Sequence, residues 1–120
     1  MTISLPTIIS DYLDAFDRGD LDAVVACFTD DAVVFDQGEE SRGHRAIRDW
    51  LENTATAYEH TVEVRGTRPL GEVDGLERHD VYTRLEGTFP GGTVDLTDQF
   101  GLRDGRIASL SFVVSTAAEA

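Results

Sequence analysis

Residues 94–107 read VDLTDQFGLRDGRI, and apolar side chains alternate with polar ones along this run, as they do in a half-buried β-strand. The pair Asp104-Gly105 is typical of a tight hairpin turn, so one further strand should follow it. Asp74-Gly75 gives the same signal earlier in the chain. The predicted strands begin near Val62 and run over Leu76–Phe89, Val94–Arg103 and Ile107–Val114. Together they form a four-stranded antiparallel meander.

Helical spacing replaces this alternation in the first half of the chain. Residues 5–18 place their apolar side chains on one stripe, with Ser4 as a cap and Gly19 as the terminator. Asp20 is placed to cap a second, shorter helix. A third helix follows further along, and its inward stripe is Ile47, Trp50, Leu51, Thr54 and Tyr58.

A short strand separates the second helix from the third. Ala32–Phe35 is apolar and ends at Asp36, and residues 37–43 are predicted to form a loop. A meander of this kind buries one face, and the helices are the only elements that can cover it. The sequence therefore predicts a single α+β domain over residues 1–120, with three helices packed on one curved sheet.

The charge of the chain argues against several kinds of partner and chemistry. A formal net charge of −13 would repel nucleic acid and anionic membranes. All ten basic residues are arginine, which excludes a Schiff-base lysine and a Walker-type lysine. Cys27 is the only cysteine, so no disulfide forms within the chain. The first residues have neither a basic start nor a long apolar run, so we expect no signal peptide, no membrane span and a cytoplasmic location.

Three polar residues occupy positions where the pattern requires apolar ones. Tyr12 lies in the middle of the apolar stripe of the first helix. Asp98 shares a strand face with Val94, Leu96, Phe100 and Leu102, where a carboxylate is costly unless it is paired or protonated. Asp36 ends the short strand just before a glycine-containing loop, at the expected rim of a pocket.

Each of these residues also has a purely structural interpretation. The Tyr12 hydroxyl could bond a backbone carbonyl, Arg84 could neutralise Asp98 across the sheet, and Asp36 could simply turn the chain. The three histidines show no ligand spacing and no cofactor-binding motif is present. We therefore expect neither a metal nor a cofactor.

Several runs of the sequence resemble one known superfamily. They are YLDAFDRGDLD at 12–22, FTDDA at 28–32, FD at 35–36, RGHRAIR at 42–48, DQF at 98–100 and DGRI at 104–107. The superfamily is the nuclear transport factor 2-like group, which includes ketosteroid isomerases, SnoaL-like polyketide cyclases and limonene epoxide hydrolases. The resemblance implies a cone-shaped, cystatin-like roll around an apolar pocket and a homodimer formed through the sheet.

The ketosteroid isomerase pattern matches position by position. It implies that Tyr12 is an oxyanion-hole donor, Asp36 the general base and Asp98 a protonated acid donor. The proline that usually follows the base is Gln37 here, and the next loop is shorter. The implied activity is cofactor-free isomerisation of a small hydrophobic carbonyl compound. The residues expected to line the substrate pocket are Phe16, Trp50, Tyr58, Leu96, Phe100 and Phe112.

Two alternatives remain open at this point. Arg78-His79-Asp80 resembles the Arg-x-Asp pair of the epoxide hydrolases, and with Arg84 it gives an alternative polar site. In that family's pattern the third carboxylate falls on Phe112, and its tyrosine-asparagine pair on Val34 and Asp36, so needed groups are missing. The other alternative is a protein without enzymatic activity that binds a small hydrophobic ligand or acts as a dimeric scaffold.

Overall fold

The amino-terminal helices form where the apolar stripe and its terminators predict them. α1 spans Thr7–Arg18 and ends at Gly19, whose φ of 71° is a left-handed conformation that glycine adopts without strain. α2 spans Leu21–Ala26, and the Asp20 carboxylate caps it by accepting a hydrogen bond from the Ala23 amide at 3.1 Å.

The computed structural model describes residues 5–55, 60–87 and 92–114. The predicted cap Ser4 and the predicted pocket residue Tyr58 lie outside these ranges, and Pro6 stands at the start of α1. α3 spans Gly43–Trp50 and continues into a π-helical segment, η1, over Leu51–Ala55. None of the helices within the described ranges is long and apolar enough to cross a membrane.

The strands form one six-stranded sheet in the order β2-β1-β6-β5-β4-β3. They are β1 Phe28–Asp36, β2 Glu39–Arg42, β3 His60–Val73, β4 Leu76–Gly87, β5 Thr93–Arg103 and β6 Arg106–Val114. The predicted meander is confirmed as β3 to β6, with antiparallel neighbours. β1 extends this meander by pairing parallel to β6, so the sheet is mixed.

The prediction of a loop over residues 37–43 is wrong in part. After the turn at Gln37 and Gly38 the chain reverses and β2 pairs with β1, with Asp36 opposite Glu39. The burial pattern of β2 contains no buried residue, so no alternation of apolar side chains marked it as a strand.

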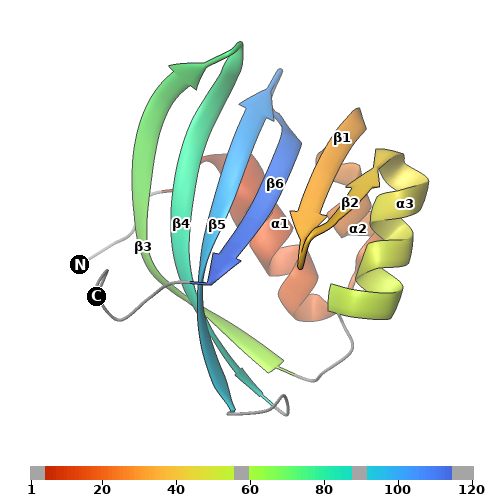
Figure 1. Ribbon diagram of the computed structural model, residues 1–120, viewed down its shortest axis with the longest axis vertical. Helices are drawn as coiled ribbons and strands as arrows, with labels where there is room; N and C mark the ends of the chain where they lie inside the picture. The colour runs from red at the N-terminus through yellow and green to blue at the C-terminus, as the bar shows by residue number, and fades with distance from the viewer. Residues whose placement is uncertain (1–4, 56–59, 88–91, 115–120) are drawn as a thin grey trace.

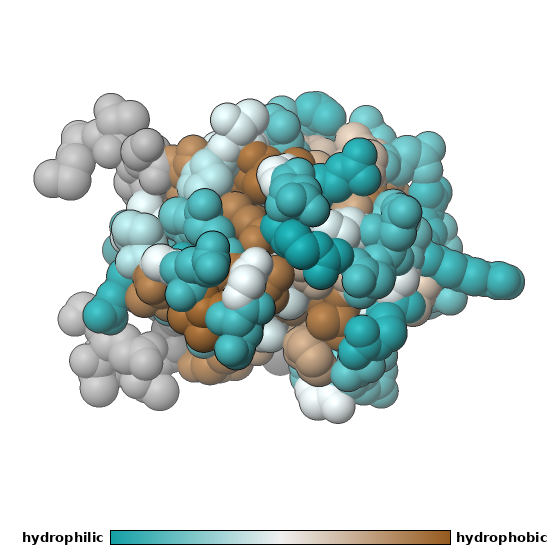
Figure 2. Space-filling model, turned by 90° about the horizontal axis from the view of Figure 1, so that it is seen from above, coloured by the Kyte–Doolittle hydropathy of each residue, from teal (hydrophilic) through white to brown (hydrophobic). Residues whose placement is uncertain are grey.

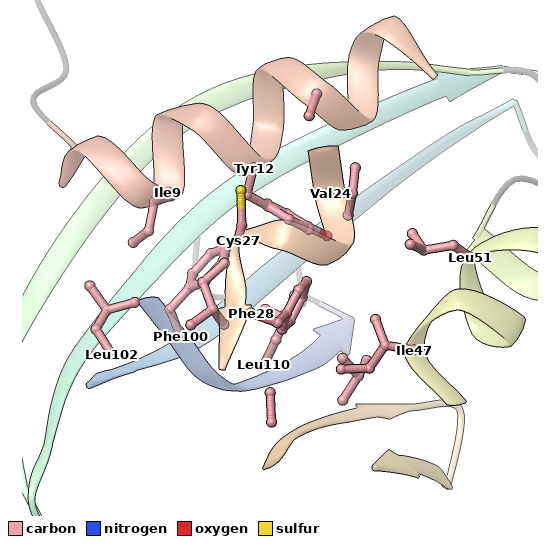
Figure 3. Packing of buried hydrophobic residues seen from close by; sticks show 14 of the residues in the cluster. Ile9, Tyr12, Val24, Cys27, Phe28, Ile47, Leu51, Phe100, Leu102 and Leu110 are labelled. Atoms are coloured by element: carbon pink, nitrogen blue, oxygen red, sulfur yellow. The ribbon is translucent and has the colours of Figure 1, made fainter. Parts of the chain in front are cut away.

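All three helices lie on the same side of the sheet, and that side holds the core. Figure 1 shows α1 crossing behind the meander while α3 lies beside β1 and β2. Figure 3 shows core side chains from α1, α2, α3 and the sheet meeting between these layers. We call the helix-covered side of the sheet the inner face and the uncovered side the outer face. This arrangement confirms the predicted α+β fold.

Candidate functional site

Tyr12 is held in the core by aromatic neighbours. Its ring makes edge-on contacts with Phe28 at 5.9 Å and Phe100 at 5.7 Å between centroids. Figure 3 shows the ring reaching from α1 into the core, with the hydroxyl oxygen at its far end. Burial raises the pKa of Tyr12 well above its usual value, and the charges of Asp98 and Asp36 raise it further. The phenol therefore stays protonated, and its O–H can donate a hydrogen bond.

Asp98 lies on the inner face of β5 and is 4% exposed. Burial raises its pKa to about 7, and the nearby charge of Asp36 acts in the same direction. A hydrogen bond from Thr83 Oγ1 to Asp98 Oδ1, at 3.4 Å, partly opposes this shift. A carboxyl group with this pKa is a hydrogen-bond donor in a large share of molecules at neutral pH.

The alternative in which Arg84 neutralises Asp98 is wrong. Arg84 pairs across the sheet with Asp95, to which its Nε and Nη2 donate at 2.7 Å and 3.0 Å. Because side chains alternate along a strand, Asp95 points to the outer face while Asp98 points inward. Arg84 lies three residues along β4 from Val81, the register partner of Asp98, and on the opposite face, so no guanidinium from this position neutralises Asp98.

Asp36 stands at the end of β1 and is partly exposed. The indole Nε1–H of Trp50 donates to Asp36 Oδ2 at 2.9 Å. Asp36 and Asp98 thus occupy contrasting environments, one partly wet and one dry.

A continuous set of contacts connects the three elements that carry these groups. Phe112 lies opposite Asp98 in the β5–β6 register and stacks on Trp50 with centroids 5.6 Å apart. Phe100 lies two residues beyond Asp98 on the same face and contacts the ring of Tyr12. Asp36, Tyr12 and Asp98 therefore gather on the inner face, and we call them the inner site. A phenol, a buried acid that keeps its proton and a partly exposed carboxyl group can together move a proton next to a carbonyl group.

Comparison with known proteins shows the family to which this chain belongs. The family model described as the SnoaL-like domain matches residues 9–110. The chain belongs to the SnoaL-like domain family. The fold is that of the nuclear transport factor 2-like superfamily, as the sequence resemblance implied.

Solved structures of similar proteins agree with this membership. This SnoaL-like chain is 35% identical to a candidate polyketide cyclase from Sinorhizobium meliloti, with a TM-score of 0.82 over 91% of this chain and 95% of that one. It is 26% identical to SalBIII, described as an epoxide hydrolase/cyclase-like enzyme of pyran ring formation in the polyether salinomycin, with a TM-score of 0.72 over 91% and 88%. A protein from Catenulispora acidiphila with a ketosteroid isomerase-like fold is 17% identical, with a TM-score of 0.77 over 95% and 89%, and shows the fold alone.

Five of the expected pocket residues lie within the described ranges of this SnoaL-like chain. The ring centroids of Phe16 and Tyr12 lie 6.1 Å apart. Leu96 is two residues from Asp98 on β5 and shares its face of the sheet. Trp50, Phe100 and Phe112 are the aromatic side chains of the contacts above. These side chains are apolar or aromatic, and Trp50 and Phe100 are buried in the core.

The alternative polar site lies on the other side of the sheet. Arg78 donates to Ser109 on the outer face at 3.3 Å, and Arg84 is paired on that face as well. Asp80 lines an outer groove of about 390 Å³, together with Arg68, Tyr82, Thr97, Gln99 and Val113. The structure therefore does not bring the Arg-x-Asp pair together with the inner site.

Sequence reasoning missed the contribution of Thr83. It lies two residues from Val81, the register partner of Asp98, and so shares the inner face of β4. The signal was a threonine at an inward position of a strand next to a buried acid. Within the described ranges, no group of histidine, cysteine, aspartate and glutamate side chains could hold a metal ion.

Proposed function

We propose that this protein catalyses cofactor-free proton transfer on a small hydrophobic carbonyl compound. The observation that carries the proposal is the contrast between the buried Asp98, whose pKa is near 7, and the partly exposed Asp36. The charges of both aspartates raise the pKa of the buried Tyr12 hydroxyl. Pairs of titratable groups with opposite environments are the usual basis of acid and base roles in one site.

The mechanism assigns one role to each group. Asp36 takes a proton from the carbon next to the carbonyl, and the C–H electron pair forms the enolate. Tyr12 and protonated Asp98 donate hydrogen bonds to the enolate oxygen, where negative charge develops. Asp36 then returns the proton to another carbon, which completes an isomerisation. Because Asp98 donates only when protonated, activity should fall as the pH rises above about 7.

A second candidate shares the first step. An enolate formed at the inner site can attack a second carbonyl carbon of the same substrate, which forms the C–C bond of a ring and breaks the C=O π bond. The resulting alkoxide takes back the proton that Asp36 removed. The family and the 35% identical candidate polyketide cyclase support this ring-forming version. The two candidates differ in the substrate and not in the residues.

The test compares Asp36→Asn with the unchanged protein on two sets of substrates, unsaturated ketones for isomerisation and linear polyketones for ring closure. Loss of a positioned base is expected to lower kcat by about 10²–10⁴-fold, and Tyr12→Phe by about 10²–10³-fold. Asp17→Asn, an exposed aspartate on α1, is the control and should keep full activity.

Two outcomes would count against the proposed catalysis. Turnover that survives Asp36→Asn would refute the assigned base. Tight binding of these compounds by the unchanged protein without any turnover would support the ligand-binding alternative instead.

A further inference from the structure

Trp50, the only tryptophan of the chain, is fixed on two sides. Its ring stacks on Phe112 at an interplanar angle of 30°, and its indole N–H donates to Asp36 Oδ2 at 2.9 Å. The side chain is buried, so the hydrogen bond is largely shielded from competing water. Sequence analysis expected Trp50 only to line the pocket. The geometry gives it a more specific contact.

Asp36 needs an anchor from outside its own strand. It is the last residue of β1, and the chain turns immediately after it through Gln37 with φ of 52° and Gly38 with φ of 81°. The resembled family has a proline directly after the base, and this chain has Gln37 there. The pairing of Asp36 with Glu39 fixes the main chain at this point, but it leaves the rotation of the carboxylate to side-chain contacts. α3 supplies an anchor from the other side through Trp50.

The two carboxylate oxygens of Asp36 are consequently different. Oδ2 accepts the indole N–H, and the hydrogen bonds among the described residues place no donor on Oδ1. A carboxylate that is held by one oxygen keeps the other in a fixed direction, and fixed geometry is a large part of catalytic efficiency.

We propose that Trp50 is a positioning residue that holds Asp36 by Oδ2 and so makes Oδ1 the oxygen that takes and returns the substrate proton. This inference rests on the proposed function, because it assigns a role within that proton transfer. In each turnover the proton passes from substrate carbon to Oδ1 and back to carbon, and Trp50 keeps its own proton throughout.

The first test is Trp50→Phe, which keeps an aromatic ring against Phe112 and removes the N–H. Positioning predicts that kcat falls by about 10- to 100-fold while KM changes by less than about threefold. The low-pH limb of the rate profile should move to higher pH, because the ionised carboxylate loses a hydrogen-bond donor. The matched control is Phe35→Thr, next to Asp36 but with its side chain on the outer face, which should leave both constants unchanged.

Other titratable groups face Asp36 and must be separated in the profile. They are Tyr12 from α1, Asp98 from β5 and Glu39, its register partner on β2. Repeating the low-pH limb in an Asp98→Asn background removes the group that titrates near neutral pH. The shift caused by Trp50→Phe should persist there.

The second test does not depend on turnover. A nitrogen-15 spectrum of the unchanged protein should contain one indole N–H signal, and that signal should move on acidification as Asp36 takes up a proton. Asp36→Asn should abolish the movement. An indole signal that ignores pH in the unchanged protein would overturn the proposal, because Trp50 would then not be bonded to a titrating carboxylate.

The two tests distinguish a failure of the positioning role from a failure of the proposed function. An active unchanged enzyme whose kcat and pH profile are not altered by Trp50→Phe overturns the positioning role alone. Absence of turnover on every ketone overturns the proposed function, and the positioning role with it, even where the indole signal titrates.

Discussion

Asp98 sits where a negative charge is unfavourable, and this has a consequence for stability. Its pKa is about 7 in the folded protein and about 3.9 in an unfolded chain. Between these values the unfolded chain has released the proton and the folded chain keeps it. The contribution of Asp98 to the free energy of unfolding is therefore complete below about pH 4. It decreases as the pH rises and is lost above about pH 7.

The amide of Asp98→Asn has nearly the same size and never ionises, so this variant should escape the penalty. At pH 8 we expect it to be more stable than the unchanged protein by about 2–4 kcal/mol, and at pH 4 to differ little. Urea unfolding of both proteins at both pH values measures this. An equal difference at the two pH values would contradict the buried, protonated acid.

The residues of the inner site differed in how far the sequence revealed them. Tyr12 and Asp98 were found because each breaks an apolar pattern whose period is reliable in a helix or a strand. The two-residue period of a strand also puts Asp98 and Asp95 on opposite faces of β5. In the β4–β5 register, Arg84 lies opposite Asp95. The hydrogen bond of Trp50 to Asp36 was not predictable, since it depends on how α3 lies against β1.

At the scale of elements, local patterns predicted the helices and the meander and missed the pairings between distant segments. The glycine after α1 and the Asp-Gly turns at 74–75 and 104–105 fix where elements end, because their backbones have positive φ. The parallel pairing of β1 with β6 joins residues that lie far apart in sequence. No local pattern carries such a pairing. The short exposed strand β2 was not predicted, because its side chains do not alternate between apolar and polar.

At the scale of the whole molecule, the outer face of the sheet is the surface that the helices leave uncovered (Figure 1). Figure 2 shows one end of the molecule, where hydrophilic side chains cover most of the surface and apolar residues appear in patches between them. On the outer face acids are matched by arginines: Arg84 pairs with Asp95, and Arg68 lies opposite Asp80. This matching lowers the repulsion that a net charge of −13 imposes on two approaching copies.

We propose that two copies associate through this face, as the family resemblance implied. Sedimentation of the unchanged protein should give the mass of a dimer. Val113→Asp places a charge at a 48% exposed valine of the outer groove and should give monomers. Ser10→Asp adds the same charge at an exposed serine of α1, on the other side of the sheet, and should leave the dimer intact. A monomeric unchanged protein would refute this association.

The inner site holds a buried aspartate that keeps its proton and a partly exposed aspartate, together with a phenol. Titration of the Asp98 carboxyl carbon by carbon-13 NMR tests this claim most directly. The account predicts a midpoint near pH 7 that falls in Asp36→Asn, because that variant removes the neighbouring negative charge. A midpoint near pH 4 that ignores Asp36→Asn would contradict it.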